Sequence, residues 1–222
     1  MIVGVQATAA RMSQETVAAQ AMLTRFAQWQ GRAPESVAAD TTYGNGEFLQ
    51  WLADREITPY MRTRESVHRK NSPFYGPERF TYQPASNSYR CPAGEQLNYG
   101  GRNQRNRTYA YIGTRKRCGG CALKAQCTSG AFRYLAIHMD EPARQRAREL
   151  ANTPEFATAQ RQRKKVEALF AQLKNQIGLR RVRLRRLKFV REQFFLAAAA
   201  QNIKRLVRFL SPPKQLALPA TA

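Results

Sequence analysis

A single carboxylate stands inside a strongly basic stretch of this chain. Residues 161–191 contain twelve Lys or Arg and one acid, Glu167. Two kinds of chemistry suit such a residue. It can form an ion pair with Arg163 one turn before it, worth only about 0.2–0.5 kcal/mol, or it can bind a metal ion beside a phosphate backbone. At about 100° per residue, the helix predicted over 155–177 places four polar side chains in one stripe beside an apolar arc. They are Gln160, Arg163, Glu167 and Lys174.

Aspartate, the other carboxylate that could share a metal ion with Glu167, occurs only three times in the sequence. Asp40 ends a buried strand predicted over 37–40, just before a glycine-containing turn. Metal ions and ligands gather at such strand ends in α/β sheets, whereas the competing interpretation makes Asp40 the cap of a turn or helix. The other two are predicted to be an exposed helical residue, Asp54, and the cap of the following helix, Asp140.

Four cysteines form a second candidate metal site. Their spacing is C-x26-C-x2-C-x5-C, and the "CGGC" turn can bring two thiolates to one tetrahedral ion. Four such ligands would fill a structural zinc site and leave no open position. Free thiols and an iron–sulfur cluster are the alternatives, since thiolates suit the cluster too. The four residues are Cys91, Cys118, Cys121 and Cys127.

The composition indicates a polyanionic partner. The 222 residues carry 37 Lys or Arg against 15 Asp or Glu, a formal charge of +22, and 43% are hydrophobic, which is enough for a core. Because neutralised phosphates release counterions, nucleic acid is the expected partner. A membrane is the competitor, but no stretch approaches the roughly 18 apolar residues of a spanning helix. Without a secretory signal at the start, we expect a cytoplasmic protein, where cysteines favour metals over disulfides.

The elements that must position these residues fall into four segments. Residues 1–63 follow a β-α-β-α-β pattern that opens with a strand at residue 2, the pattern of a sheet with crossover helices. Residues 64–139 are rich in Tyr, Gly, Pro and Asn and predict small antiparallel hairpins around the cysteines. Residues 140–210 are predicted to be helical, and 211–222 to form a loose tail.

Five motifs carry a resemblance to a known family: "VAADTTYGNGEFLQWL", "CPAGEQL", "CGGCALKAQC", "RKKVEALFAQLKNQIGLRRVRLRR" and "AAAAQNIKRLVRFL". Together, over about residues 1–210, they resemble bacterial insertion-sequence transposases of the DDE type. The resemblance implies an α/β fold, an RNase-H-like core in which a mixed sheet is flanked by helices. It also implies a small β-rich insertion with four cysteines between the second catalytic Asp and the Glu. The 126 residues between Asp40 and Glu167 agree with such an insertion.

The resemblance also assigns roles to residues. Asp40 matches the second catalytic Asp of the family. Glu167, with Arg163 and Lys174, matches the signature Y-x2-R-x3-E-x6-K, in which Gln160 replaces the Tyr. The carboxylates would hold Mg²⁺ or Mn²⁺ for cleaving and joining double-stranded DNA, with a homodimer on the DNA. Arginines of "GLRRVRLRRLK" would bind phosphates of the transposon ends and the target. They are Arg180, Arg181, Arg183, Arg185 and Arg186.

No Asp precedes Asp40, although the resemblance implies a first catalytic Asp on the first strand of the core. Glu15 and Glu35, the only earlier acids, fall in a predicted helix and just before a strand. We therefore expect the C-terminal part of a transposase, with an incomplete core and no catalysis by this chain alone. Two other interpretations remain. One is a zinc-stapled DNA-binding module that competes with full-length transposase, and the other is a basic structural protein such as a ribosome-associated factor.

Overall fold

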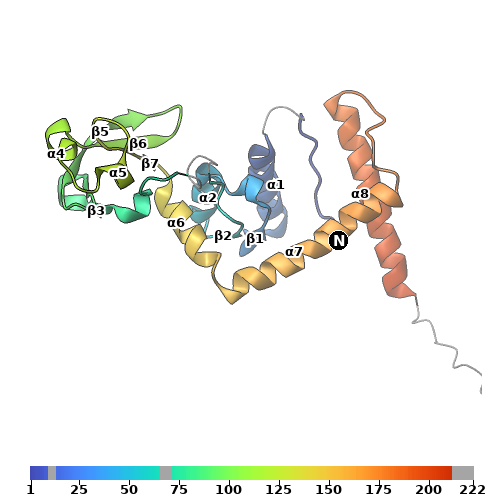
Figure 1. Cartoon of the computed structure of the whole chain (residues 1–222). Helices are drawn as coiled ribbons and strands as arrows, with labels where there is room; N and C mark the ends of the chain where they lie inside the picture. The colour runs from blue at the N-terminus through green and yellow to red at the C-terminus, as the bar shows by residue number, and fades with distance from the viewer. Residues whose placement is uncertain (10–13, 66–71, 212–222) are drawn as a thin grey trace, which may run out of the picture. The chain divides into compact units, whose positions relative to one another are not determined.

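The chain divides into two compact units, which are drawn in Figure 1. The residues that this computed structural model describes are 1–9, 14–65 and 72–211. Unit 1 comprises Met1–Pro34 and Thr158–Ala222, and unit 2 comprises Glu35–Ala157. The architecture is mixed α/β, as the sequence predicts, with helices in both units and an antiparallel sheet in unit 2. The RNase-H-like core, the cysteine insertion and the segment boundaries stay predictions, and the predicted tail lies, beyond Ser211, outside the described residues.

Unit 2 begins with two short parallel strands joined by a helix. Strand β1 (Ser36–Ala38) pairs with β2 (Thr58–Tyr60), and α2 (Gly46–Ala53) connects them. The buried strand expected over 37–40 is therefore shorter than predicted. It is also more exposed, because within β1 only Val37 is partly buried. Two three-residue strands give this sheet few side chains to cover, so the helices supply most of the core.

The apolar face of α2 packs against α6 (Glu141–Leu150) and forms one core of unit 2. Asn45 sets the start of α2, because its Oδ1 accepts a hydrogen bond from the N–H of Phe48 at 2.8 Å. Each large aliphatic side chain buried in this way stabilises the fold by about 1.5–3 kcal/mol. The buried residues are Phe48, Leu49, Leu52, Ile57, Met61, Ala143 and Ala147.

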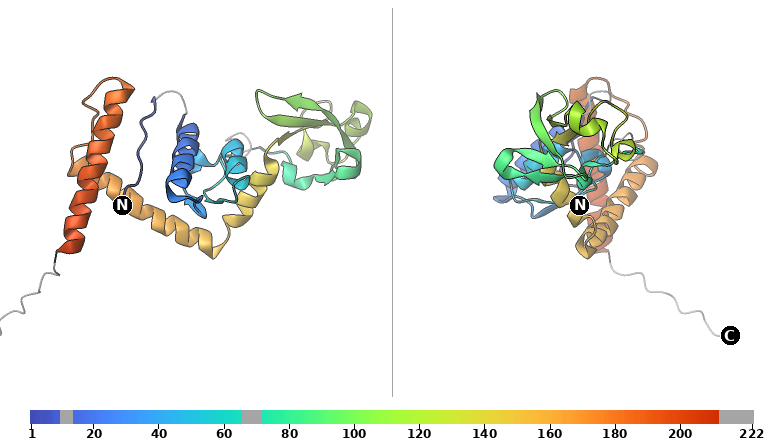
Figure 2. Two further views of the ribbon diagram at one scale, coloured as in Figure 1. Left: turned by 180° about the vertical axis from the view of Figure 1, so that it is seen from behind. Right: turned by 60° about the vertical axis from the view of Figure 1, so that its left-hand side comes forward.

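A five-stranded antiparallel sheet forms the middle of unit 2, and its strands pair in chain order. The register shifts between Tyr99 and Gly101, and Gly101 has a φ of +120°, so β5 bends there and the sheet curls (Figure 2). The strands are β3 (Thr81–Gln83), β4 (Ser88–Arg90), β5 (Gln96–Asn103), β6 (Thr108–Ile112) and β7 (Tyr134–His138). Its own core cluster is Phe80, Leu97, Tyr111, Leu135 and Ile137.

Five short helices lie among the described segments of unit 2. They are η1 (Thr41–Tyr43), η2 (Pro77–Arg79), η3 (Pro84–Ser86), α4 (Arg115–Gly119) and α5 (Lys124–Cys127). Three of them, η3, α4 and α5, connect strands of this sheet. Thr114 caps α4, since its hydroxyl oxygen accepts from the N–H of Arg117. The short antiparallel hairpins expected from the Tyr, Gly, Pro and Asn content are thus present between β3 and β7.

An ion pair between a buried carboxylate and a more exposed arginine joins the sheet to the helices that follow it. The side chain of Asp140 is only 9% exposed, and both of its oxygens accept hydrogen bonds from Arg107 at 3.0 Å. Asp140 precedes α6 as predicted, but its side chain makes no cap bond and turns to Arg107 instead. Gly46 lets α2 approach this corner, because a Cβ there would lie 2.5 Å from Cε1 of His138.

Unit 1 consists of three long helices and an extended N-terminal segment. Figures 1 and 2 show α8 lying across the C-terminal part of α7, and Gln201 of α8 bonds to Gln172 of α7 there. The helices are α1 (Glu15–Gln30), α7 (Pro154–Asn175), whose first turn belongs to unit 2, and α8 (Leu187–Leu210). Helices therefore form over much of the segment 140–210 that the sequence marks as helical.

The strand predicted from residue 2 is not observed, since residues 1–9 have no regular secondary structure. Asn202 of α8 instead satisfies the backbone of Ile2 on both sides. Its Oδ1 accepts from the N–H of Ile2 at 2.8 Å, and its Nδ2 donates to the carbonyl of Ile2 at 2.7 Å. An amide side chain thus takes the place that a neighbouring strand would have in a sheet.

The apolar core of unit 1 is thin. Among its described hydrophobic side chains only Leu173, Ala197 and Ala198 are buried, while Trp29 and Phe170 are 71% and 56% exposed. The apolar arc predicted on α7 is therefore buried mainly at Leu173. A cavity of about 620 Å³ separates the N-terminal segment and α1 from α7 and α8. Large apolar side chains of α8 are exposed as well, among them Leu196, Phe209 and Leu210.

Candidate functional site

Asp40 lies just beyond the C-terminal end of β1, where the sequence predicts a ligand-binding carboxylate. The residue is exposed, and its Oδ1 accepts a hydrogen bond from the N–H of Thr42 at 2.8 Å. Asp40 is therefore the N-cap of η1, which is the competing role that the sequence allowed. This contact occupies one of the two carboxylate oxygens.

Glu167 lies on α7 with its side chain 57% exposed, and it pairs with Arg163 at 3.0 Å. Arg163 also donates a hydrogen bond from Nε to the side-chain oxygen of Gln160 at 3.0 Å. Three members of the predicted polar stripe thus touch one another along the helix, and Lys174 follows in the last turn. The ion pair occupies one oxygen of the carboxylate. Glu167 and Asp40 belong to different units, so a metal ion shared between them stays a prediction.

Positive charge is concentrated in unit 1. This unit contains 19 of the 37 Lys and Arg but only 3 of the 15 acidic residues, so it carries +16 of the net +22. Unit 2 holds the other 12 acids against 18 Lys or Arg, so its net charge is only +6. Such a local excess of cations creates a strong positive potential that attracts a polyanion such as nucleic acid.

The loop between α7 and α8, residues 176–186, is hereafter the arginine loop. Arg180 donates to Oδ1 of Asn175 at 2.9 Å, which fixes one guanidinium beside the end of α7. Among the described residues, the side chains of the other four arginines have no hydrogen-bond or ion-pair partner, and all four are exposed. They are Arg181, Arg183, Arg185 and Arg186. A loop that presents free guanidinium groups in this number is suited to phosphate binding.

The four cysteines converge although 26 residues separate the first from the others. All four are free, partly buried and line one cavity of about 30 Å³, room for a single ion or water. Cys91 follows β4, and the other three lie in or beside α4 and α5. Within the described ranges, however, no group of three or more His, Cys, Asp or Glu is arranged so that it could hold a metal ion. The donor set suits zinc, but the thiols do not form a closed coordination shell.

Arg133 lies beside this cavity and joins it to the sheet core. Its guanidinium donates to the carbonyls of Cys127 and Tyr75 and stacks 5.1 Å from the ring of Phe80. Its Nε is buried without a partner. Burial raises the pKa of the Cys127 thiol, Arg133 lowers it, and the three other cysteines raise it again. Burial prevails, so the pKa of Cys127 lies above its ordinary value.

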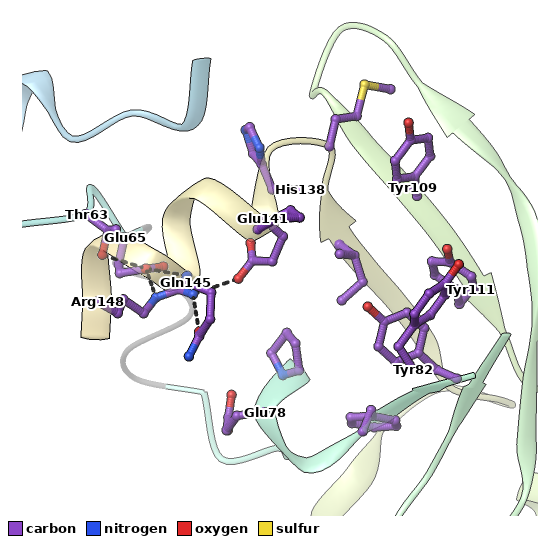
Figure 3. Close-up of a pocket in the computed structure, with 16 residues that line it drawn as sticks. Thr63, Glu65, Glu78, Tyr82, Tyr109, Tyr111, His138, Glu141, Gln145 and Arg148 are labelled. Carbon is purple, nitrogen blue, oxygen red and sulfur yellow. Dashed lines mark hydrogen bonds and ion pairs between the residues drawn. The ribbon is translucent and has the colours of Figure 1, made fainter. Parts of the chain in front are cut away.

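A cleft of about 790 Å³ separates the curled sheet from α6 in unit 2 (Figure 3). Tyrosines from three strands form the sheet side, while Glu141, Gln145 and Arg148 of α6 lie on the other. Burial, followed by the neighbouring tyrosines, raises the pKa of Tyr111 to about 12, so the Tyr111 side chain is uncharged near neutrality. The tyrosines are Tyr82, Tyr89, Tyr109 and Tyr111.

The polar end of the cleft is an ion-pair network that ties the loop after β2 to α6. Glu65 accepts from Arg144 and from Arg148 at 2.9 Å, and Arg148 also bonds to Glu141 at 2.8 Å. Neither the cleft nor this network was predicted from the sequence. The pair Tyr109 and Tyr111 was the available signal, because alternate residues of a strand share one face. The partners of Glu65 follow it by 79 and 83 residues, so no local pattern marks them.

The positive charge of unit 1 and its exposed arginines suit a polyanionic partner. A family model described as a transposase DDE domain matches residues 90–207. Because the match covers more than half of the 222 residues, the chain belongs to the DDE transposase family, whose members act on DNA. The matched range includes Glu167, the arginine loop and all four cysteines, and it excludes Asp40. No curated protein and no solved structure matches the chain.

Within the described part of the chain, no helix is both long enough and apolar enough to cross a bilayer.

The raised pKa of Cys127 predicts slow alkylation. With metal removed by a chelator, Cys127 should react with iodoacetamide at pH 8 more slowly than an ordinary thiol, because less of it is thiolate. The rate should rise as the pH increases through the raised pKa. Peptide mass spectrometry after timed quenching measures it, and the urea-unfolded chain, in which all four thiols react alike, is the control. Equal rates in the folded and unfolded chains would contradict the prediction.

Proposed function

We propose that this chain is the DNA-binding and Glu-bearing part of an insertion-sequence transposase. It would bind double-stranded transposon ends and target DNA and contribute carboxylates to metal-dependent strand cleavage and strand transfer. One observation carries the proposal: the family match extends over Glu167 and the arginine loop, which lie in the unit that holds most of the positive charge. The substrate and its binding surface are therefore chemically complementary.

The DNA-binding residues would be the arginines of the arginine loop together with three side chains of α7. Exposed guanidinium groups form charge-assisted, often bidentate bonds to phosphate, and they set the register without reading bases. Arg163 would contact a phosphate while it pairs with Glu167. Gln160 supports Arg163 where the family has a Tyr, and Lys174 adds a charge in the last turn of α7.

Asp40 and Glu167 would together hold Mg²⁺ or Mn²⁺, which are hard ions that prefer carboxylate oxygens. Asp40 engages one oxygen in the turn cap, and Glu167 engages one with Arg163, so each has a second oxygen for an ion. When bound, such ions activate the attacking water or 3′-hydroxyl and stabilise the leaving oxygen. The role of the protein is to hold the carboxylates and the phosphate backbone against each other.

The chain supplies two carboxylates where the family resemblance implies three. No aspartate precedes Asp40 in the sequence. We infer that the isolated chain binds DNA but does not cut or join it, because two carboxylates under-ligate a pair of metal ions.

The four cysteines would hold a structural zinc ion. Their convergence on one small cavity supports this role, as does Arg133, whose positive charge offsets that of the thiolates. Binding would draw the thiolates together and connect the end of β4 with α4 and α5. A metal cross-link of this kind suits a sheet whose described core cluster contains five buried residues.

The DNA-binding proposal predicts a steep salt dependence. Affinity for duplex DNA should fall by about 10³–10⁵ between roughly 50 and 200 mM salt, as expected for about six to ten phosphate contacts. Arg181→Gln should lower the slope of log K against log salt by about 0.9, because one contact is lost. Arg105→Gln, which removes an exposed arginine of unit 2, is the matched control and should change neither value. Fluorescence anisotropy provides both numbers, and a flat salt response would overturn the proposal.

The carboxylate proposal predicts a metal site that two substitutions remove. Mn²⁺ binding in the presence of duplex DNA, measured by water-proton relaxation, should be lost in Asp40→Asn and in Glu167→Gln. Asp54→Asn should keep it, because Asp54 only accepts a bond from Gln50 on its own helix. Equal Mn²⁺ binding by all three variants would refute the assignment. A nicking assay on the same DNA should show no turnover, and robust turnover would contradict the missing third carboxylate.

The zinc proposal predicts about one zinc per purified chain. Cys118→Ser should lose most of it, whereas His138→Gln, which changes a metal-capable side chain outside the cavity, should keep it. Elemental mass spectrometry gives the count. A brown chain with iron would identify the cluster alternative, and a metal-free chain with four titratable thiols would leave zinc without support.

A further inference from the structure

We propose that Gln193 is a positioning residue that holds the arginine loop in the shape that binds DNA phosphates; this inference rests on the proposed function. Gln193 lies in the second turn of α8 and is partly buried. Its side chain reaches back to the backbone of the loop rather than to solvent. Oε1 accepts from the N–H of Arg183 at 3.0 Å and of Leu184 at 3.3 Å, and Nε2 donates to the carbonyl of Arg181 at 3.4 Å.

These three contacts are the hydrogen bonds that hold the middle of the loop. The start of the loop is fixed by Leu179, whose N–H donates to the carbonyl of Leu173 at 3.0 Å. Its end is fixed by the carbonyl of Arg186, which begins α8. Between these points, in the part of the chain that the structure describes, the backbone of residues 181–184 has no other hydrogen-bond partner. One glutamine amide therefore determines the course of this segment.

Electrostatics and backbone strain both work against this shape. Five arginines within seven residues repel one another, which favours a more open loop. Arg186 also adopts a φ of +68°, a conformation that an L residue holds only when its surroundings impose it. The neutral amide of Gln193 offsets both effects without adding a negative charge that would weaken phosphate binding.

Preordering the loop raises DNA affinity, because the conformational entropy of the loop is then lost on folding rather than on binding. This role has a signature that loss of charge lacks. If the three hydrogen bonds of Gln193 are removed, the same arginines still reach the same phosphates. The number of released counterions therefore stays constant. Affinity should then fall by a constant factor at every salt concentration. Removal of an arginine instead changes the slope itself.

The test compares variants of the full chain in the DNA-binding assay. Gln193→Leu, which removes all three bonds, should bind duplex DNA about tenfold more weakly with an unchanged salt slope. Arg183→Gln should lower the slope by about 0.9. Gln50→Leu is the matched control, since this amide bonds only to Asp54 on its own helix, and it should behave as the unaltered chain.

Amide hydrogen exchange tests the hydrogen bonds of Gln193 directly and independently of DNA. The amides of Arg183 and Leu184 should be protected in the unaltered chain and unprotected in Gln193→Leu. Gln193→Glu keeps both acceptor contacts, so it should restore protection at these amides even though its charge lowers affinity. Exchange across α7 and α8 shows that each variant is folded, which separates a local role from general destabilisation.

The outcomes distinguish this inference from the function on which it rests. Unchanged affinity in Gln193→Leu, together with weakened binding in Arg183→Gln, would overturn the role of Gln193 alone. Equal exchange of the two amides in the unaltered chain and Gln193→Leu would do the same. A flat salt response by the unaltered chain would overturn the proposed function, and the role of Gln193 with it.

Discussion

A buried carboxylate, Asp140, determines how the sheet of unit 2 connects to its helices. Its charge is offset by Arg107 from the turn between β5 and β6, and the N–H of Met139 bonds to the carbonyl of Arg107 beside it. Removing Arg107 would leave this buried carboxylate without its charge partner, which destabilises the fold. Gly46 brings α2 to the same corner, and the burial that results lowers the pKa of His138. The start of α6, and with it the network around Glu65, depends on this contact.

The two units balance their charges in different ways. Unit 2 pairs its acids with arginines inside the fold, as Glu65 does with Arg144 and Arg148. Unit 1 has almost no acids to pair, so most of its arginines are exposed around a thin apolar core. Self-repulsion of this kind destabilises a compact state, and a bound polyanion relieves it. The chain belongs to a family that acts on DNA, and DNA is a polyanion of the kind that this excess of positive charge suits.

The candidate metal sites share one property, because each is built from side chains that already have another role. Asp40 caps η1, Glu167 pairs with Arg163, and the cysteines surround a small cavity between β4 and two short helices. Every carboxylate or thiolate that binds an ion must exchange or share these contacts. Metal binding is therefore coupled to local structure at each of them.

The sequence by itself determined what depends on neighbours a few residues apart. Helical spacing predicted the polar stripe that contains Gln160, Arg163 and Glu167, and residue types predicted the cysteine group and the polyanion partner. The capped turn at Asp40 was only the competing interpretation of that residue. Tertiary structure alone decided contacts between distant residues: Asn202 with Ile2, Arg107 with Asp140, Gln193 with the arginine loop and the tyrosine cleft. The strand expected at residue 2 failed for this reason, because a strand needs a partner edge and an asparagine of α8 supplied the hydrogen bonds. Such pairings depend on where the chain returns in space, which local periodicity does not encode.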